Sequence, residues 1–146
     1  MRRFTIATIK DVKEIEFLSG KSSFNYTYDK TAVDLLKKHF LLKDSLYLIA
    51  KKSTEFAAFC SIDKDWWEEN LFFIREIFVD PKFQKLGIGK TMIGKCIEHA
   101  KDKKAIGIVT ETDFKNTPMK NLCEKFNFKK WDNPRWKEGI TYKLIF

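Results

Sequence analysis

The spacing of apolar residues along the chain predicts short strands that alternate with amphipathic helices. Strands are expected where apolar and polar residues alternate or where turn residues bound a short apolar run, and helices where apolar residues recur three and four positions apart. The expected strands are residues 3–8, 45–51, 56–63, 71–79, 105–110, 128–132 and 140–146. The expected helices are one that begins at an Asp11 N-cap and those at residues 30–40, 87–103 and 115–126.

The order of these elements predicts an α+β fold. A short polar turn joins the strands at residues 45–51 and 56–63, so they should form an antiparallel hairpin. The helix at residues 87–103 lies between two strands and should connect them in parallel. We therefore expect a single domain over residues 1–146, with a mixed, mostly antiparallel sheet of about seven strands, a central parallel βαβ unit and about four helices on both faces.

The composition is that of an ordinary globular protein, with 44% hydrophobic and 33% charged residues. No apolar run approaches the roughly 20 residues that cross a bilayer, and no apolar segment follows the two N-terminal arginines as in a secretion signal. We expect neither a membrane partner nor a bound metal, because the cysteines and histidines are too widely spaced for a disulfide framework or a zinc site. These cysteines and histidines are Cys60, Cys96, Cys123, His39 and His99. Because no disulfide framework is expected, we predict a reducing, cytoplasmic location.

The net charge of +8 raises the alternative of a basic nucleic-acid-binding domain. The lysines are scattered through every segment, however, and the longest basic run is Lys129-Lys130. This pattern is typical of a solvated surface and also suits an anionic ligand such as a phosphorylated cofactor. A nucleic acid is therefore not the expected partner.

The segment at residues 77–93 carries the most informative motif. An apolar strand leads through Asp80-Pro81 into a loop with Gly87 and Gly89, and then into a helix. Glycines let backbone N–H groups point inward at the positive end of the helix dipole, where phosphate binds. A P-loop would need a further glycine at position 84, which is Gln84, so nucleotide hydrolysis is not favoured. The purely structural alternative is a glycine turn that starts a helix and binds no ligand.

The same residues resemble motif A of the GNAT N-acetyltransferase superfamily, in which Gln-x-x-Gly-x-Gly follows a strand and opens a helix. Gln84, Gly87 and Gly89 occupy these positions. The segment from Asn116 to Phe128 resembles the motif B of that family. Both motifs stand in the right order, and the order of elements along the whole chain is similar to that of the family. The resemblance implies the GNAT fold and the transfer of an acetyl group from acetyl-CoA to a primary amine.

The resemblance also implies which residues bind acetyl-CoA. The strand before the loop would lend backbone groups to the pantetheine arm, and the loop would hold the pyrophosphate. A helix that starts further along the chain would add one asparagine. These residues are Ile77, Phe78, Val79, Gln84, Lys85, Leu86, Gly87, Ile88, Gly89, Lys90, Thr91 and Asn116.

Glu76 is the candidate catalytic base. An amine must lose its proton before it attacks the thioester, and a carboxylate in an otherwise apolar strand has its pKa raised toward the useful range. The structural alternative is an ion pair at the sheet surface. Adjacent residues of a strand point to opposite faces, so we do not expect Arg75 to be the partner of Glu76.

Cys123 is the second candidate catalytic residue. It stands where members of the family commonly have a tyrosine that protonates the departing thiolate. A thiol can act as an acid, although it is a weaker donor than a phenol, and free cysteine more often packs as a small apolar residue. Both alternatives remain open, and so does a catalytically weak acyl-CoA-binding or sensor module.

Aromatic residues mark where the acceptor amine would enter. The resemblance places the acceptor between the loop that joins the first two helices, the middle strands and the last strand pair. Rings together with carboxylates suit a cationic amine, although a solvated hairpin tip is the simpler explanation. The acceptor could be a small molecule or a peptide, and a homodimer is possible. The rings are Phe24, Tyr26, Tyr28, Trp66, Trp67, Trp131 and Trp136, and the carboxylates are Asp63, Asp65, Glu68 and Glu69.

Overall fold

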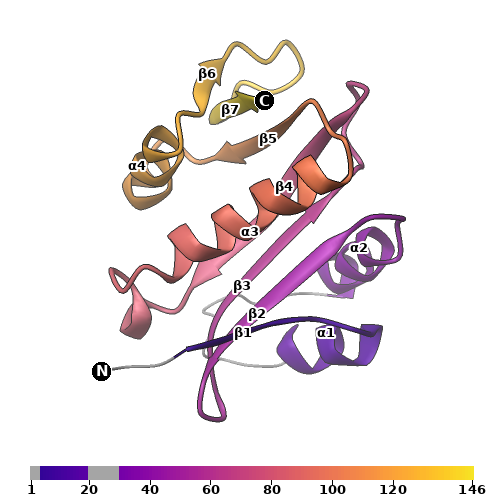
Figure 1. The fold of residues 1–146 in the computed structure, drawn as a ribbon, viewed down its shortest axis with the longest axis vertical. Coiled ribbons are helices and arrows are strands. Elements are labelled where there is room, and N and C mark those ends of the chain that lie inside the picture. The colour runs from indigo at the N-terminus through magenta and orange to yellow at the C-terminus, as the bar shows by residue number, and fades with distance from the viewer. Residues whose placement is uncertain (1–3, 20–29) are drawn as a thin grey trace.

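The computed structural model of the protein describes residues 4–19 and 30–146, in which seven strands form one sheet and four α-helices pack against it (Figure 1). The strands are β1 (Thr5–Thr8), β2 (Leu46–Lys52), β3 (Glu55–Asp63), β4 (Leu71–Val79), β5 (Gly107–Thr112), β6 (Lys129–Trp131) and β7 (Ile140–Ile145). The helices are α1 (Val12–Ser19), α2 (Lys30–Phe40), α3 (Ile88–Asp102) and α4 (Thr117–Lys125), and a short 3-10 helix, η2 (Pro81–Phe83), follows β4.

The sheet is antiparallel except at its centre. Its strands lie in the order β1-β2-β3-β4-β5-β7-β6, and each neighbouring pair is antiparallel apart from β4 and β5. Helix α3 connects these two strands and completes the βαβ unit (Figure 1). The predicted α+β class, the mixed sheet and the central parallel pair are therefore confirmed.

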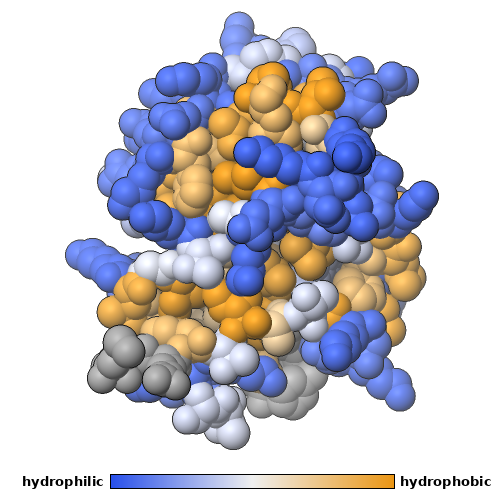
Figure 2. Space-filling model, viewed as in Figure 1, coloured by the Kyte–Doolittle hydropathy of each residue, from blue (hydrophilic) through white to orange (hydrophobic). Residues whose placement is uncertain are grey.

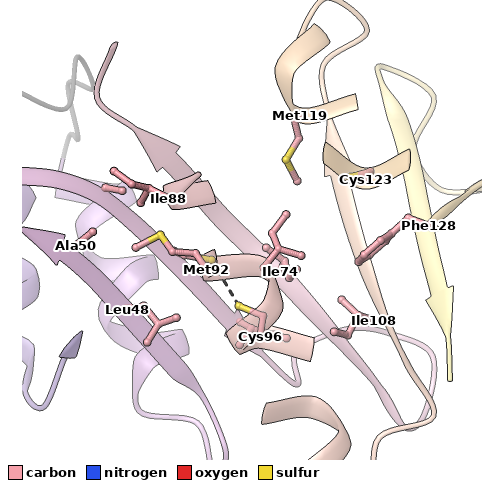
Figure 3. Close-up of a cluster of buried hydrophobic side chains, with 14 of the residues drawn as sticks. Leu48, Ala50, Ile74, Ile88, Met92, Cys96, Ile108, Met119, Cys123 and Phe128 are labelled. Carbon is pink, nitrogen blue, oxygen red and sulfur yellow. Dashed lines mark hydrogen bonds between the residues drawn. The ribbon is translucent and has the colours of Figure 1, made fainter. Parts of the chain in front are cut away.

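Helices α3 and α4 cover one face of the sheet and bury the larger core. Met92 and Cys96 of α3 pack with Ile74 of β4, and Met119 and Cys123 of α4 belong to the same cluster (Figure 3). In Figure 2 hydrophilic residues run across the middle of the view, where α3 lies in Figure 1, with hydrophobic residues on both sides. The helix is thus amphipathic as predicted, with one side against the sheet.

Helices α1 and α2 cover the opposite face. Ile15 of α1 and Leu36 of α2 form a second buried cluster with Tyr47 and Phe59 of the sheet. Neighbouring residues of β2 alternate between the two clusters, because successive side chains of a strand point to opposite faces. The helix α1 starts as expected, since the Asp11 carboxylate accepts a hydrogen bond from the Glu14 N–H (3.0 Å).

Two element boundaries differ from the sequence prediction in ways that matter for the site. Strand β5 begins and ends two residues later than expected, so that Glu111 is part of the strand. Helix α4 begins only after Asn116, whose side-chain oxygen accepts a hydrogen bond from the Met119 N–H (3.2 Å). Among the described residues, no helix is long and apolar enough to span a bilayer.

Candidate active site

Strands β4 and β5 diverge halfway along β4. They pair only from Leu71 with Gly107 to Ile74 with Thr110, where the Thr110 hydroxyl also donates to the Ile74 carbonyl (3.1 Å). Beyond this point β4 continues to Val79 beside β3, and β5 continues beside β7 (Figure 1). The edge of β4 that faces β5 is therefore not covered by a strand past Ile74, and an extended ligand with amide groups can pair with it.

A β-bulge lies at the point of divergence. Ser61 of β3 pairs with Glu76, whereas the next residue of β3 pairs with Ile74, so Arg75 is the extra residue of β4. Arg75 binds Asp63, which lies two residues from Ser61 and hence on the same face of β3. The bulge thus places Arg75 and Glu76 on one face, and the strict alternation expected from the sequence does not hold here.

The loop after β4 is folded back on the end of that strand. The buried Asp80 caps η2, because its carboxylate accepts from the Lys82 N–H (2.9 Å). The Gln84 side chain donates to the Val79 carbonyl (3.1 Å) and so fastens the loop to β4. Lys85 and Gly87 both adopt positive φ angles, of 65° and 87°. For Gly87 this conformation carries no steric cost, which is the reason for a glycine here.

The N-terminus of α3 is open. Its N-cap residue is Gly87, which has no side chain with which to accept from the first-turn N–H groups. A Cβ atom on Gly89 would lie 3.3 Å from the Leu122 side chain of α4 and 3.8 Å from that of Val79. The end of β4, the start of α3 and helix α4 therefore meet at Gly89. Unsatisfied N–H groups at a helix N-terminus attract a phosphate group.

The basic residues of this loop differ in their availability. Lys82 forms an ion pair with Glu55. Lys85 and Lys90 are exposed and form no ion pair within residues 4–19 and 30–146. These two ammonium groups are consequently the ones that can face an anionic ligand. Asn116 is exposed and uses its side-chain oxygen as the N-cap of α4.

Glu76 lies on the face of the sheet that α1 and α2 cover. Burial raises the pKa of its carboxyl group, and the nearby Arg75 guanidinium lowers the pKa only in part. Within the described residues, the carboxylate of Glu76 forms no hydrogen bond or ion pair. A partly buried carboxylate with a raised pKa, whose oxygens have no hydrogen-bond partner among the described residues, is suited to accept a proton.

Glu111 is a second carboxylate beside the diverging strands. It follows Thr110, the last residue of β5 that pairs with β4, and burial raises the pKa of its carboxyl group. Asn133 donates to this carboxylate (3.3 Å). The sequence prediction ended the strand at Thr110 and therefore missed Glu111. A signal was present in the Thr-Glu-Thr pattern of residues 110–112, which continues the alternation of a strand.

Cys123 is fully buried in the larger core, between α4 and the sheet (Figure 3). Burial raises the pKa of its thiol to about 12, and the charge of Glu124 adds to this effect. Such a thiol packs as an apolar group. Tyr142 of β7 lies close enough to Cys123 for their charges to interact, and its hydroxyl donates to the Glu124 carboxylate (3.2 Å).

We expect Cys123→Ser to leave kcat within about two-fold of the wild-type value while lowering the free energy of unfolding by about 1–2 kcal/mol, because a hydroxyl replaces a buried apolar sulfur. Steady-state kinetics and urea denaturation measure the two quantities. A loss of kcat of about 100-fold in a folded variant would contradict the packing role and make Cys123 a participant in the reaction.

Three of the four carboxylates near Trp66 and Trp67 are engaged within the protein. Asp63 binds Arg75 through both oxygens, Asp65 accepts from His39 (2.7 Å), and Glu68 pairs with Lys143 (2.7 Å). These three groups therefore do not form the open cation site that the sequence suggested. Phe24, Tyr26 and Tyr28, also expected near the acceptor, lie outside the described residues.

Three of the tryptophans, Trp66, Trp67 and Trp131, nevertheless lie ring against ring. The rings of Trp67 and Trp131 lie 5.8 Å apart, and Trp66 packs on Phe73 (5.1 Å). Arg135 lies 4.1 Å from the centre of the Trp67 ring. Lys143 lies 3.4 Å from the centre of the Trp131 ring, so Trp67 and Trp131 both already have cation–π partners within the protein.

The Gln-x-x-Gly-x-Gly loop and the helix that it opens stand where the sequence resembles the GNAT superfamily. The chain belongs to the acetyltransferase (GNAT) family, because the model of that family matches residues 12–128. A curated relative from Bacillus subtilis (strain 168), named provisionally as a ribosomal protein bS18-alanine N-acetyltransferase, is 27% identical over 126 residues. The match covers 86% of this chain and 78% of the relative.

Solved structures show the same fold. The ribosomal-protein-S18-alanine N-acetyltransferase from Escherichia coli matches with a TM-score of 0.76 and 14% identity, over 98% of this chain and 94% of that chain. The PaiA N-acetyltransferase from Thermoplasma acidophilum, solved in complex with coenzyme A, matches with a TM-score of 0.69 and 15% identity over 99% of both chains. The predicted family and fold are thereby confirmed.

Proposed function

We propose that the protein transfers the acetyl group of acetyl-CoA to a primary amine. The observation that carries this proposal is the opening between β4 and β5, which ends beside the uncapped N-terminus of α3. An extended arm can pair with the free edge of a strand, while a pyrophosphate needs a cluster of N–H groups, and acetyl-CoA has both parts. We treat all 146 residues as one catalytic domain.

In this proposal the loop and the start of α3 hold the pyrophosphate. Leu86, Gly87, Ile88 and Gly89 supply backbone N–H groups, and Lys85 and Lys90 supply charge. Gln84 keeps the loop against β4, and Thr91 closes the first turn, since its N–H and hydroxyl both donate to the Gly87 carbonyl. The pantetheine arm pairs with β4 along Ile77, Phe78 and Val79, and Asn116 contacts the cofactor from the start of α4.

The thioester then lies between β4 and β5, next to the point where they diverge. Glu76 accepts the proton of the attacking amine, directly or through water, because its raised pKa brings it closer to that of the amine. Backbone N–H groups of the diverging part of β4 stabilise the oxyanion of the tetrahedral intermediate. Glu111 binds the incoming ammonium group from the β5 side.

We further propose that the acceptor is the α-amino group of a protein. The relative from Bacillus subtilis is named for alanine acetylation of a ribosomal protein, which motivates this choice and a cytoplasmic location. An α-amino group has a pKa of about 7.7–8.0, against about 10.4 for lysine, so a much larger fraction is neutral at pH 7. A single carboxylate base is then sufficient to take up the proton that the amine loses during the reaction.

The experiment that tests the acceptor class is a competition among amines. The protein is mixed with acetyl-CoA and with equal concentrations of an alanine-initiated peptide, the same peptide with a blocked N-terminus and an internal lysine, and a polyamine. We expect mass spectrometry to find acetylation at the free α-amino group, at a rate at least ten-fold above that of lysine, as the difference in amine pKa implies.

Two other outcomes are informative. Faster acetylation of lysine or of the polyamine would contradict the proposed acceptor but not the acetyl transfer. Tight binding of acetyl-CoA without transfer to any of the amines would favour a binding or sensor module, which the cysteine at position 123 keeps as the second candidate.

A further inference from the structure

A buried hydroxyl group without a partner lies directly opposite Glu76. Ser61 of β3 is fully buried, and its Oγ atom forms no hydrogen bond with any described atom. Its partner on β4 is Glu76, whose carboxylate is likewise without a hydrogen bond among the described residues. Directly opposed residues have Cβ atoms about 4.5–5.5 Å apart, so the Ser61 hydroxyl and the Glu76 carboxylate lie within reach of one shared water molecule.

Tyr47 continues this row of polar groups on the next strand. It pairs with Ser61 across β2 and β3, and its hydroxyl donates to the Leu36 carbonyl of α2 (2.8 Å). Burial raises the pKa of Tyr47, and the Ser61 hydroxyl, directed at the phenol oxygen, lowers it, so the two hydroxyls are close although they do not reach hydrogen-bond geometry. Because the Tyr47 proton is already used, the tyrosine cannot donate to Ser61 and leaves the serine free to accept a hydrogen bond.

The charged groups around Glu76 are bound to one another. On β4, Arg75 donates through Nε and Nη2 to Asp63 of β3. On the other side of Asp63, Asp65 pairs with His39 of α2, and Glu111 of β5 accepts from Asn133. Among the described residues no cation pairs directly with Glu76, and the charge of Arg75 offsets its burial only in part. A buried polar group without a partner calls for an explanation, and a bound water is one.

We propose that Ser61 is a positioning residue that holds a water molecule against the Glu76 carboxylate. This inference rests on the proposed acetyl transfer for its catalytic meaning. During the reaction the amine N–H bond breaks, its proton passes to the oxygen of this water, and the water gives one of its own protons to a Glu76 oxygen. The nitrogen lone pair forms the bond to the thioester carbon while the carbonyl π electrons move onto oxygen. When the carbonyl re-forms, the C–S bond breaks, coenzyme A leaves as a thiolate that solvent protonates, and Glu76 returns its proton to solvent.

The test is the variant Ser61→Ala, with Ser45→Ala as the matched control, because the Ser45 hydroxyl already donates to the Phe40 carbonyl. Carbon-detected NMR of the glutamate carboxyl groups gives the pKa of Glu76 without any substrate. Loss of a hydrogen-bonding water leaves the carboxylate less solvated, so we expect this pKa to rise by about one unit in Ser61→Ala and to stay unchanged in Ser45→Ala.

Kinetics supply the second readout. The reactive base must be deprotonated, so the acidic limb of the kcat/KM profile should move to higher pH with the pKa of Glu76, and kcat should fall about ten-fold. An unchanged Glu76 pKa in a folded Ser61→Ala variant would overturn the inference, and so would a crystal structure in which Ser61 bonds only to Tyr47. The NMR measurement tests the contact between Ser61 and Glu76 even if no amine is acetylated. A failure of this inference can therefore be told apart from a failure of the proposed function.

Discussion

Replacing Glu76 with glutamine is expected to lower kcat/KM about 100-fold at pH 7, the usual contribution of a positioned base. The pKa of Glu76 is raised by burial, so wild-type activity should fall as the pH drops through this raised value, because the base becomes protonated. Glutamine cannot accept the proton, so the acidic limb set by Glu76 should disappear and only the ionisation of the amine should remain in the profile. At high pH the amine is already neutral, so the variant should recover a large part of its rate. A pH series of initial rates measures both effects.

Stability and a second variant serve as controls. A carboxyl group with a raised pKa stabilises the folded state less as the pH rises, so Glu76→Gln should be at least as stable as the wild type at pH 7. Glu111→Gln removes the neighbouring carboxylate and should raise KM for the amine while keeping the acidic limb. If Glu111→Gln loses the limb and Glu76→Gln keeps it, the base lies on β5 and our assignment to β4 is wrong.

Replacing Gly89 with aspartate is expected to weaken the binding of acetyl-CoA at least 100-fold. The new Cβ would crowd Leu122 at 3.3 Å, and the carboxylate would compete for the N–H groups of α3 and repel the pyrophosphate. An acidic residue in the first turn favours the helix dipole, so the variant should remain folded. Isothermal titration calorimetry with acetyl-CoA gives the change in Kd.

Gly94 of the same helix offers a matched control. A Cβ on Gly94 would meet no atom within 4 Å, and the residue lies beyond the first turn of α3. Gly94→Asp introduces the same charge and should change the Kd for acetyl-CoA by no more than about two-fold, because the dipole effect is confined to the first turn. Equal losses in both variants would show that the α3 N-terminus is not where the pyrophosphate binds.

The fold was predictable because the spacing of apolar residues within each element and the order of the elements along the chain indicate the same architecture. Strand β4 has the predicted bounds, and α3 and the hairpin of β2 and β3 lie within two residues of theirs. The motif around Gly87 and Gly89 marks a loop conformation that few other residues allow. Such signals are local, and a sequence displays them directly.

The acceptor side was less predictable because it depends on pairing between strands. A β-bulge reverses the alternation at Arg75, and nothing in the sequence of β4 marks the extra residue. The same bulge gives Asp63 an ion-pair partner and so removes it from the candidates for amine binding. The row formed by Tyr47, Ser61 and Glu76 exists only through the register of three strands.

The release of the coenzyme A thiol is the direct measure of acetyl transfer. Purified protein is mixed with acetyl-CoA and an alanine-initiated peptide, and free thiol and acetylated peptide are measured together. We expect thiol release that saturates with acetyl-CoA, equals the acetylated peptide in amount and falls sharply in Glu76→Gln and Gly89→Asp. Thiol release no faster than in a protein-free blank, from folded protein and across all the amines named above, would contradict the proposed acetyl transfer.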